Sequence, residues 1–248
     1  MNESVKEVEI KLRVVELTAR RALKRLGAKP AGIAGAGKPR AKSGGRCYEF
    51  NTLFDVPDGG LAKHGQMLRI RVETPEGRGA AKSKATRTVF TFKGPSASNS
   101  EASAALGRRY KVREEHEVEV AGSDALRQIL EGLGLRPWFH YEKYRTRYQL
   151  PAKHRWAAGL KIDLDETPIG AFLEIEGSPE AIDRTAELLG YHHGDYITKS
   201  YLALYLEQCR RRGQTAGDML FPKRGGARGR EKNAAAGHSF LDKVPDTL

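Results

Sequence analysis

The chain has 248 residues, of which 39% are hydrophobic, enough to bury one good core. The N-terminal residues carry an acid and lead straight into an alternating pattern, and no run of about 18 apolar residues occurs, so we expect neither a signal peptide nor a membrane-spanning helix. Two cysteines, Cys47 and Cys209, are too few for a disulfide framework and lack the spacing of metal ligands. These features predict a cytoplasmic protein without a membrane partner.

The formal charge of +12 is concentrated in segments that are rich in Gly and Ala. From Cys209 onward the sequence has nine Lys or Arg residues against four acids. We therefore predict a folded domain over residues 1–208, followed by a basic tail over 209–248 that is disordered. Such a tail makes nucleic-acid binding possible as a secondary property, but it does not indicate nucleic acid as the main partner.

The segment 5–15 alternates strictly between apolar and charged residues. In a strand this alternation gives two chemically distinct faces. One face would carry Val8, Ile10, Leu12 and Val14, and the other Glu7, Glu9, Lys11 and Arg13. A single strand of this kind ordinarily turns its charged face to water. Here the pattern recurs along the chain, which favours charged faces that share one enclosed space.

Seven later segments resemble strands, with helices between some of them. The expected strands cover residues 47–55, 66–73, 88–94, 110–120, 139–150, 160–166 and 171–177. The expected helices cover 16–27, 61–64, 123–133, 179–190 and 198–212. The stretches 28–46, 74–87 and 95–109 are rich in Gly, Ala, Ser and cations, and we interpret them as long loops able to act as lids.

Eight antiparallel strands can just close a barrel whose interior is filled by side chains. Carboxylates alone could not fill it, since two like charges about 4 Å apart repel by about 4 kcal/mol at an effective dielectric near 20. Interleaved Lys and Arg side chains, together with a divalent cation, would offset that repulsion. We therefore predict an α+β fold: an eight-stranded antiparallel β-barrel that forms a tunnel with a charged interior and is flanked by helices.

Six charged segments of the sequence form an ordered set of motifs. The chain opens with E-x-E-x-K at Glu7, Glu9 and Lys11. The later segments are L-R-I-R-V (68–72), T-F-K-G-P (91–95), V-R-E-E-H-E-V (112–118), Y-E-K-Y-R (141–145) and D-E-T-P-I-G-A-F-L-E-I-E-G (165–177). In this order they resemble the CYTH family, also called triphosphate tunnel metalloenzymes, whose signature is similar to the opening E-x-E-x-K. The details are most similar to the class IV adenylyl cyclase branch, and the family also includes thiamine triphosphatases and inorganic tripolyphosphatases.

The resemblance implies a role for each charged group. The metal ligands, for Mg²⁺ or Mn²⁺, would be Glu7, Glu9, Glu174 and Glu176. The catalytic residues, as further ligands or as groups that orient the attacking group, would be Glu115 and Asp165. The residues that bind the triphosphate would be Lys11, Arg69, Arg71, Lys93, Arg113, Lys143 and Arg145.

The resemblance implies a divalent-metal-dependent enzyme, with conversion of ATP to cyclic AMP and pyrophosphate as the first candidate reaction. The alternatives are hydrolysis of tripolyphosphate, thiamine triphosphate or a nucleoside triphosphate, and a non-catalytic module that binds polyphosphate or nucleotide. The metal and phosphate sites serve both reactions, so the sequence leaves the choice open, along with the preferred metal and the oligomeric state. Four tyrosines could stack a nucleobase or serve only in packing: Tyr141, Tyr144, Tyr148 and Tyr201.

Overall fold

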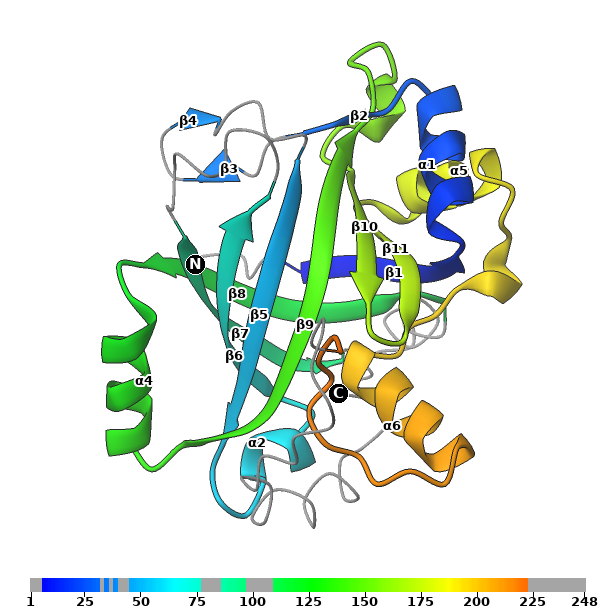
Figure 1. Ribbon diagram of the computed structural model, residues 1–248. Coiled ribbons are helices and arrows are strands. Elements are labelled where there is room, and N and C mark those ends of the chain that lie inside the picture. The colour runs from blue at the N-terminus through cyan, green and yellow to red at the C-terminus, as the bar shows by residue number, and fades with distance from the viewer. Residues whose placement is uncertain are drawn as a thin grey trace.

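Figure 1 shows the computed structural model, which describes residues 6–31, 34–35, 38–39, 45–76, 86–96 and 109–222. Most of the loops predicted at 74–87 and 95–109, and about half of the loop predicted at 28–46, lie outside these residues. The last 26 positions of the predicted basic tail, 223–248, also lie outside them.

Eight strands form one closed antiparallel barrel. In barrel order they are β10 (Lys161–Thr167), β11 (Gly170–Glu176), β1 (Lys6–Val14), β8 (Lys111–Val120), β7 (Arg87–Ser96), β6 (Met67–Pro75), β5 (Arg46–Asp55) and β9 (Arg136–Gln149). The pairing of β9 with β10 closes the ring. The short strand β2 (Lys29–Pro30) pairs with the end of β9, and β3 (Ala34–Gly35) pairs with β4 (Lys38–Pro39) in a separate ribbon. The predicted fold class is confirmed.

Helices flank the barrel, as the sequence predicts (Figure 1). They are α1 (Glu16–Arg25), α2 (Gly60–Lys63), α4 (Ser123–Gly132), α5 (Pro179–Leu188) and α6 (Tyr201–Arg211), with single 3₁₀ turns at η2 (Arg155–Ala157) and η3 (His193–Asp195). Within the described ranges, no helix has both the length and the apolar composition needed to cross a bilayer.

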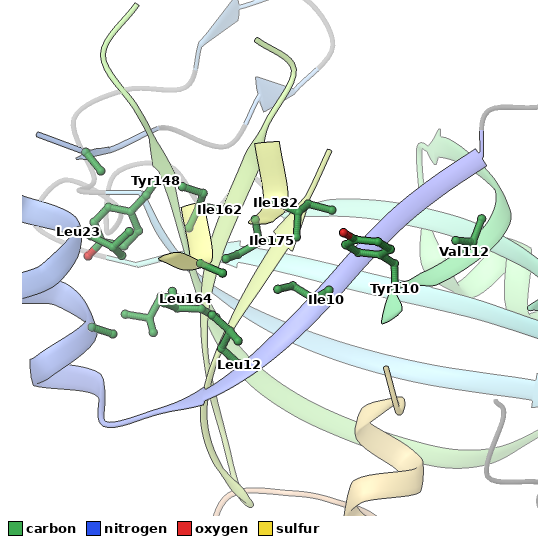
Figure 2. Packing of buried hydrophobic residues seen from close by; sticks show 14 residues of the cluster. Ile10, Leu12, Leu23, Tyr110, Val112, Tyr148, Ile162, Leu164, Ile175 and Ile182 are labelled. Carbon is green, nitrogen blue, oxygen red and sulfur yellow. The ribbon is translucent and has the colours of Figure 1, made fainter. Parts of the chain in front are cut away.

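The main hydrophobic core lies outside the barrel, between its wall and the helices α1 and α5 (Figure 2). Ile10 of β1, Leu164 of β10 and Ile175 of β11 are completely buried there, together with Leu23 of α1 and Ile182 of α5. Burying each such side chain contributes about 1.5–3 kcal/mol. Since these strands turn their apolar faces outward to the helices, their alternate residues, which carry the charges, must point into the barrel.

A second apolar cluster closes one end of the barrel. Leu53, Phe139 and Phe172 lie on the inward faces of three strands and are no more than 2% exposed. They pack against α6, which lies below the β10–β11 turn in Figure 1. The cluster also contains Met219, which follows α6 in the chain.

The segment after α6 returns to the barrel and pairs alongside β9 in a parallel bridge between Met219 and Tyr141. The Met219 amide donates to the His140 carbonyl at 2.9 Å, and the Glu142 amide donates to the Met219 carbonyl at 3.0 Å. The Phe221 amide donates to the Glu142 carboxylate at 2.8 Å. The described part of the tail therefore contacts the domain, while the division of the chain at residue 208 stays a prediction.

Candidate functional site

The inward faces of the strands enclose a charged cavity, which we call the tunnel, with a volume of about 220 Å³. Among the described residues it is lined by eleven Lys or Arg and nine Asp or Glu side chains, so positive and negative charges nearly balance. The cations are Lys11, Arg69, Arg71, Arg87, Lys93, Lys111, Arg113, Lys143, Arg145, Arg147 and Lys161. The acids are Glu7, Glu9, Glu49, Glu73, Glu115, Glu117, Asp163, Glu174 and Glu176.

The tunnel brings together all the predicted site residues except Asp165, which points inward from β10 but is covered by Tyr201 and does not line the cavity. The Asp165 carboxylate is completely buried. Its Oδ2 accepts hydrogen bonds from Lys143 Nζ at 2.8 Å, Arg145 Nη2 at 2.6 Å and the Tyr201 hydroxyl at 2.8 Å. Its position is suited to holding the two cations in place, and its predicted catalytic role stays a prediction.

Most of the predicted phosphate-binding cations are paired with tunnel carboxylates. Lys11 Nζ lies 2.9 Å from Glu9 and 3.3 Å from Glu174. Arg69 and Arg71 both contact Glu117, at 3.4 and 3.1 Å. Such pairing offsets the desolvation of the buried charges.

Arg113 is held differently, by main-chain carbonyls. Its guanidinium donates to the Gly94 carbonyl at 2.8 Å and to the Gly65 carbonyl at 2.7 Å. These neutral acceptors leave its charge uncompensated by any direct ion pair with a described residue.

The carboxylates near Lys11 differ in their affinity for protons. Burial opposes ionisation of Glu9, but the Lys11 ammonium lowers the pKa of Glu9 to about 2. Burial and the adjacent Glu9 carboxylate instead raise the pKa of Glu7 to about 8, although Lys93 lies 2.5 Å away. A further positive charge near Glu7 would therefore favour its ionised form.

The donor atoms of the four predicted metal ligands suit a hard divalent cation, because Mg²⁺ and Mn²⁺ prefer carboxylate oxygens. In the described part of the chain, however, no three carboxylate, His or Cys side chains converge as a formed metal centre requires. Each of the four is instead engaged by a cation: Glu7 by Lys93, Glu9 by Lys11, Glu174 by Arg145 and Glu176 by Lys161. The residues fit a divalent ion chemically, provided that these ion pairs exchange when the ion binds.

Sequence reasoning missed several tunnel residues, notably Lys111, Glu49 and Glu73. Lys111 is 8% exposed and forms no hydrogen bond or ion pair with a described residue. Burial and the nearby Lys11 ammonium lower its pKa well below the usual range. The alternation of the strand could have identified Lys111, because residues two apart in a strand share a face and Arg113 is predicted to point inward.

The four tyrosines divide between the two sides of the barrel wall. Tyr141 and Tyr201 line the tunnel. Tyr148 belongs to the outer core, and the ring of Tyr144 lies 3.9 Å from the Arg46 guanidinium, outside the tunnel. Only the first two can therefore contact a ligand inside it.

The end of the tunnel opposite α6 is open to solvent. Lys161, Arg147 and Arg87 lie there, with side chains 51%, 34% and 26% exposed. Each is paired with a carboxylate, for example Arg147 with Asp163 at 2.8 Å. We call this end the mouth, in contrast to the apolar end closed by α6.

Similar solved structures share the fold. A structure of a putative adenylate cyclase from Vibrio parahaemolyticus aligns with a TM-score of 0.58 at 18% identity, covering 80% of this chain and 97% of that one. A Pyrococcus horikoshii protein aligns with a TM-score of 0.58 at 22% identity, covering 82% and 99%. A conserved hypothetical protein from Pyrococcus furiosus aligns with a TM-score of 0.53 at 20% identity, covering 79% and 97%.

No curated protein matches the chain. The family model described as the CYTH domain matches residues 5–201. That match includes all eight barrel strands and every predicted site residue, so the chain belongs to the CYTH domain family.

Proposed function

We propose that this protein is a divalent-metal-dependent enzyme that cleaves the phosphate chain of a triphosphate substrate inside the tunnel, with hydrolysis as its best-supported reaction. The observation that carries the proposal is the row of buried Lys and Arg side chains facing buried carboxylates across one cavity. Members of the CYTH family typically act on triphosphates and depend on divalent metals. A cytoplasmic location is part of the proposal.

The cations of this chain would bind the phosphate oxygens. Lys11, Lys143 and Arg145 lie near the α6 end, whereas Lys93 and Arg113 come from the neighbouring strands β7 and β8. Phosphoryl transfer depends mainly on positioning and on neutralising the charge that develops in the transition state, which buried and pre-arranged cations do well. Phosphate oxygens would replace the carboxylates that now engage these cations.

The carboxylates released by that exchange would hold the metal. Glu7, Glu9, Glu174 and Glu176 are the proposed ligands, and a bound divalent ion would supply charge neutralisation and lower the pKa of an attacking water or hydroxyl. Glu115 lines the tunnel and lies 3.1 Å from Lys93, where it is suited to orient the attacking group.

The size of the tunnel favours hydrolysis. Its volume of about 220 Å³ falls below the roughly 300–1,000 Å³ typical of pockets that hold a drug-sized ligand. It therefore suits a phosphate chain, and a nucleoside would have to lie at the mouth. Cyclisation of ATP is the second candidate, favoured by the segments that resemble the class IV cyclase branch and by the Vibrio structure described as a putative adenylate cyclase.

A product assay tests the proposal. The protein is incubated with tripolyphosphate, ATP or thiamine triphosphate and either Mg²⁺ or Mn²⁺, and ion chromatography separates cyclic AMP, pyrophosphate and orthophosphate. We expect pyrophosphate and orthophosphate in equal amounts from tripolyphosphate, and none from the matched Glu9→Gln variant.

The other outcomes distinguish the alternatives. Cyclic AMP and pyrophosphate in equal amounts from ATP would assign the cyclase reaction. Binding of a triphosphate without any product, with either metal, would contradict an enzymatic role and assign a non-catalytic binding module.

A further inference from the structure

Tyr201, the first residue of α6, joins the closed end of the tunnel to its cations. The side chain lines the tunnel and is 7% exposed. Its hydroxyl donates to Asp165 Oδ2 at 2.8 Å. The same oxygen accepts from Lys143 and Arg145, so three donors share one carboxylate oxygen.

The ring of Tyr201 also contacts two ammonium groups. Lys11 Nζ lies 5.4 Å from the ring centroid and Lys143 Nζ lies 5.2 Å from it. Both distances fall within the range of about 6 Å in which the ring face attracts a cation. The ring of Phe172 packs against the Tyr201 ring in a T-shaped arrangement, with a centroid distance of 5.3 Å and an interplanar angle of 70°.

The chain on either side of α6 is anchored to the strands that carry these lysines. Before the helix, Ile197 and Lys11 exchange two main-chain hydrogen bonds, both of 2.9 Å. After the helix, Met219 bonds to the main chain of β9 at His140 and Glu142, the latter adjacent to Lys143. The position of Tyr201 is thus set by the backbones of β1 and β9.

We propose that Tyr201 is a positioning residue that holds the ammonium groups of Lys11 and Lys143 where phosphate oxygens bind, an inference that rests on the proposed function. Its hydroxyl donates a hydrogen bond to Asp165 and so weakens the attraction between Asp165 and Lys143. The Lys143 ammonium can then exchange the carboxylate for a phosphate oxygen. Its ring face attracts both ammonium groups, which otherwise repel each other. The residue therefore favours the phosphate-bound arrangement without touching the reacting atoms.

Three full-length variants separate these contributions. Tyr201→Phe removes the hydroxyl and keeps the ring, whereas Tyr201→Leu removes both. Tyr205→Phe is the matched control, because Tyr205 lies one turn later in α6 and its hydroxyl contacts Cys209, Gly217 and Asp218 instead of the tunnel cations. Calorimetry with tripolyphosphate in EDTA measures binding without turnover, and steady-state kinetics with metal gives kcat and KM.

We expect the affinity for tripolyphosphate to fall about threefold in Tyr201→Phe and about thirtyfold in Tyr201→Leu, from the loss of one hydrogen bond and of two cation–ring contacts. KM should rise by similar factors while kcat changes less, and Tyr205→Phe should match the wild type. Wild-type affinity and KM in Tyr201→Leu would overturn the proposal. If that variant does not fold by circular dichroism, wild-type values in Tyr201→Phe overturn it instead.

The binding measurement keeps this proposal distinct from the proposed function. A wild-type protein that binds tripolyphosphate without turning it over contradicts the enzymatic function, yet the affinities of the variants still decide the role of Tyr201. A wild-type protein that does not bind tripolyphosphate at all overturns both.

Discussion

Lys143 and Asp165 form an ion pair of 2.8 Å in which the side chains are only 3% and 0% exposed. Asp165 also holds Arg145 through both carboxylate oxygens. One buried acid therefore compensates two of the cations proposed to bind phosphate. A ligand that binds Lys143 and Arg145 must therefore supply negative charge and hydrogen-bond acceptors comparable to those of the Asp165 carboxylate.

Replacing Asp165 with Asn should destabilise the protein strongly. The variant leaves Lys143 buried without its nearest counter-charge and Arg145 without one of its carboxylate partners. Breaking a buried pair in this way lowers the free energy of unfolding by about 3–5 kcal/mol. Urea denaturation measures the change. Tripolyphosphate should stabilise the variant more than the wild type, because the anion replaces the missing charge.

The matched control is Asp58→Asn. Asp58 pairs with Lys63 at 3.6 Å on the surface, with side chains 73% and 52% exposed, so this change should leave stability unaltered. An Asp165→Asn variant as stable as the control would contradict the role assigned to the buried pair.

Glu9→Gln and Glu174→Gln should each lower kcat by more than about 100-fold while the fold is retained. Lys11 and its cationic neighbours keep the pKa of both carboxyls low, so both are ionised at neutral pH and available to a metal. Glutamine preserves the shape but removes the charge. Mn²⁺ binding followed by electron paramagnetic resonance, together with the product assay, checks the prediction, and full activity in either variant would refute the metal assignment.

Glu7 should make the metal-free protein less stable as the pH rises. Its folded pKa of about 8 lies above the ordinary value of 4.5, so between these values the folded state keeps a proton that the unfolded state has released. Each pH unit in this window then lowers the free energy of unfolding by about 1.4 kcal/mol per proton. In EDTA, Glu7→Gln should unfold at a higher temperature than the wild type at about pH 8.5, and at nearly the same temperature near pH 5.

The same unfolding temperatures measured with Mg²⁺ in place of EDTA test whether Glu7 binds the metal. The ion should raise the unfolding temperature of the wild type at about pH 8.5 and leave Glu7→Gln nearly unchanged, since the variant lacks a ligand charge. A pH-independent difference between the two proteins in EDTA would rule out titration of Glu7 as the cause.

The barrel was predictable because strand periodicity assigns side chains to faces without knowledge of their partners. Once Ile10 and Leu12 are placed against the helices, Glu9 and Lys11 must point inward. Helix positions followed from equally local signals, such as Pro179 in the first turn of the helix predicted at 179–190, which the structure has as α5.

The arrangement within the tunnel was not predictable in the same way, because it depends on register between strands that are distant in sequence. Asp165 and Glu174 both lie on inward faces, yet one is covered by Tyr201 and the other lines the cavity. That difference arises from α6, whose docking is set by Ile197 and Met219. No local pattern in the sequence specifies those contacts.

Replacing Lys111 with Met should raise stability and lower phosphate affinity at the same time. The ammonium is buried beside Lys11 without a direct partner among the described residues, so removing it should raise the free energy of unfolding by about 1–3 kcal/mol. A triphosphate, by contrast, would supply the missing counter-charge, and losing that interaction should weaken binding of tripolyphosphate about tenfold. Lys63→Met, at an exposed site, should change neither quantity. Urea denaturation and calorimetry measure both effects, and a Lys111→Met variant that loses stability while binding tripolyphosphate as tightly as the wild type would show that Lys111 serves the fold and not the ligand.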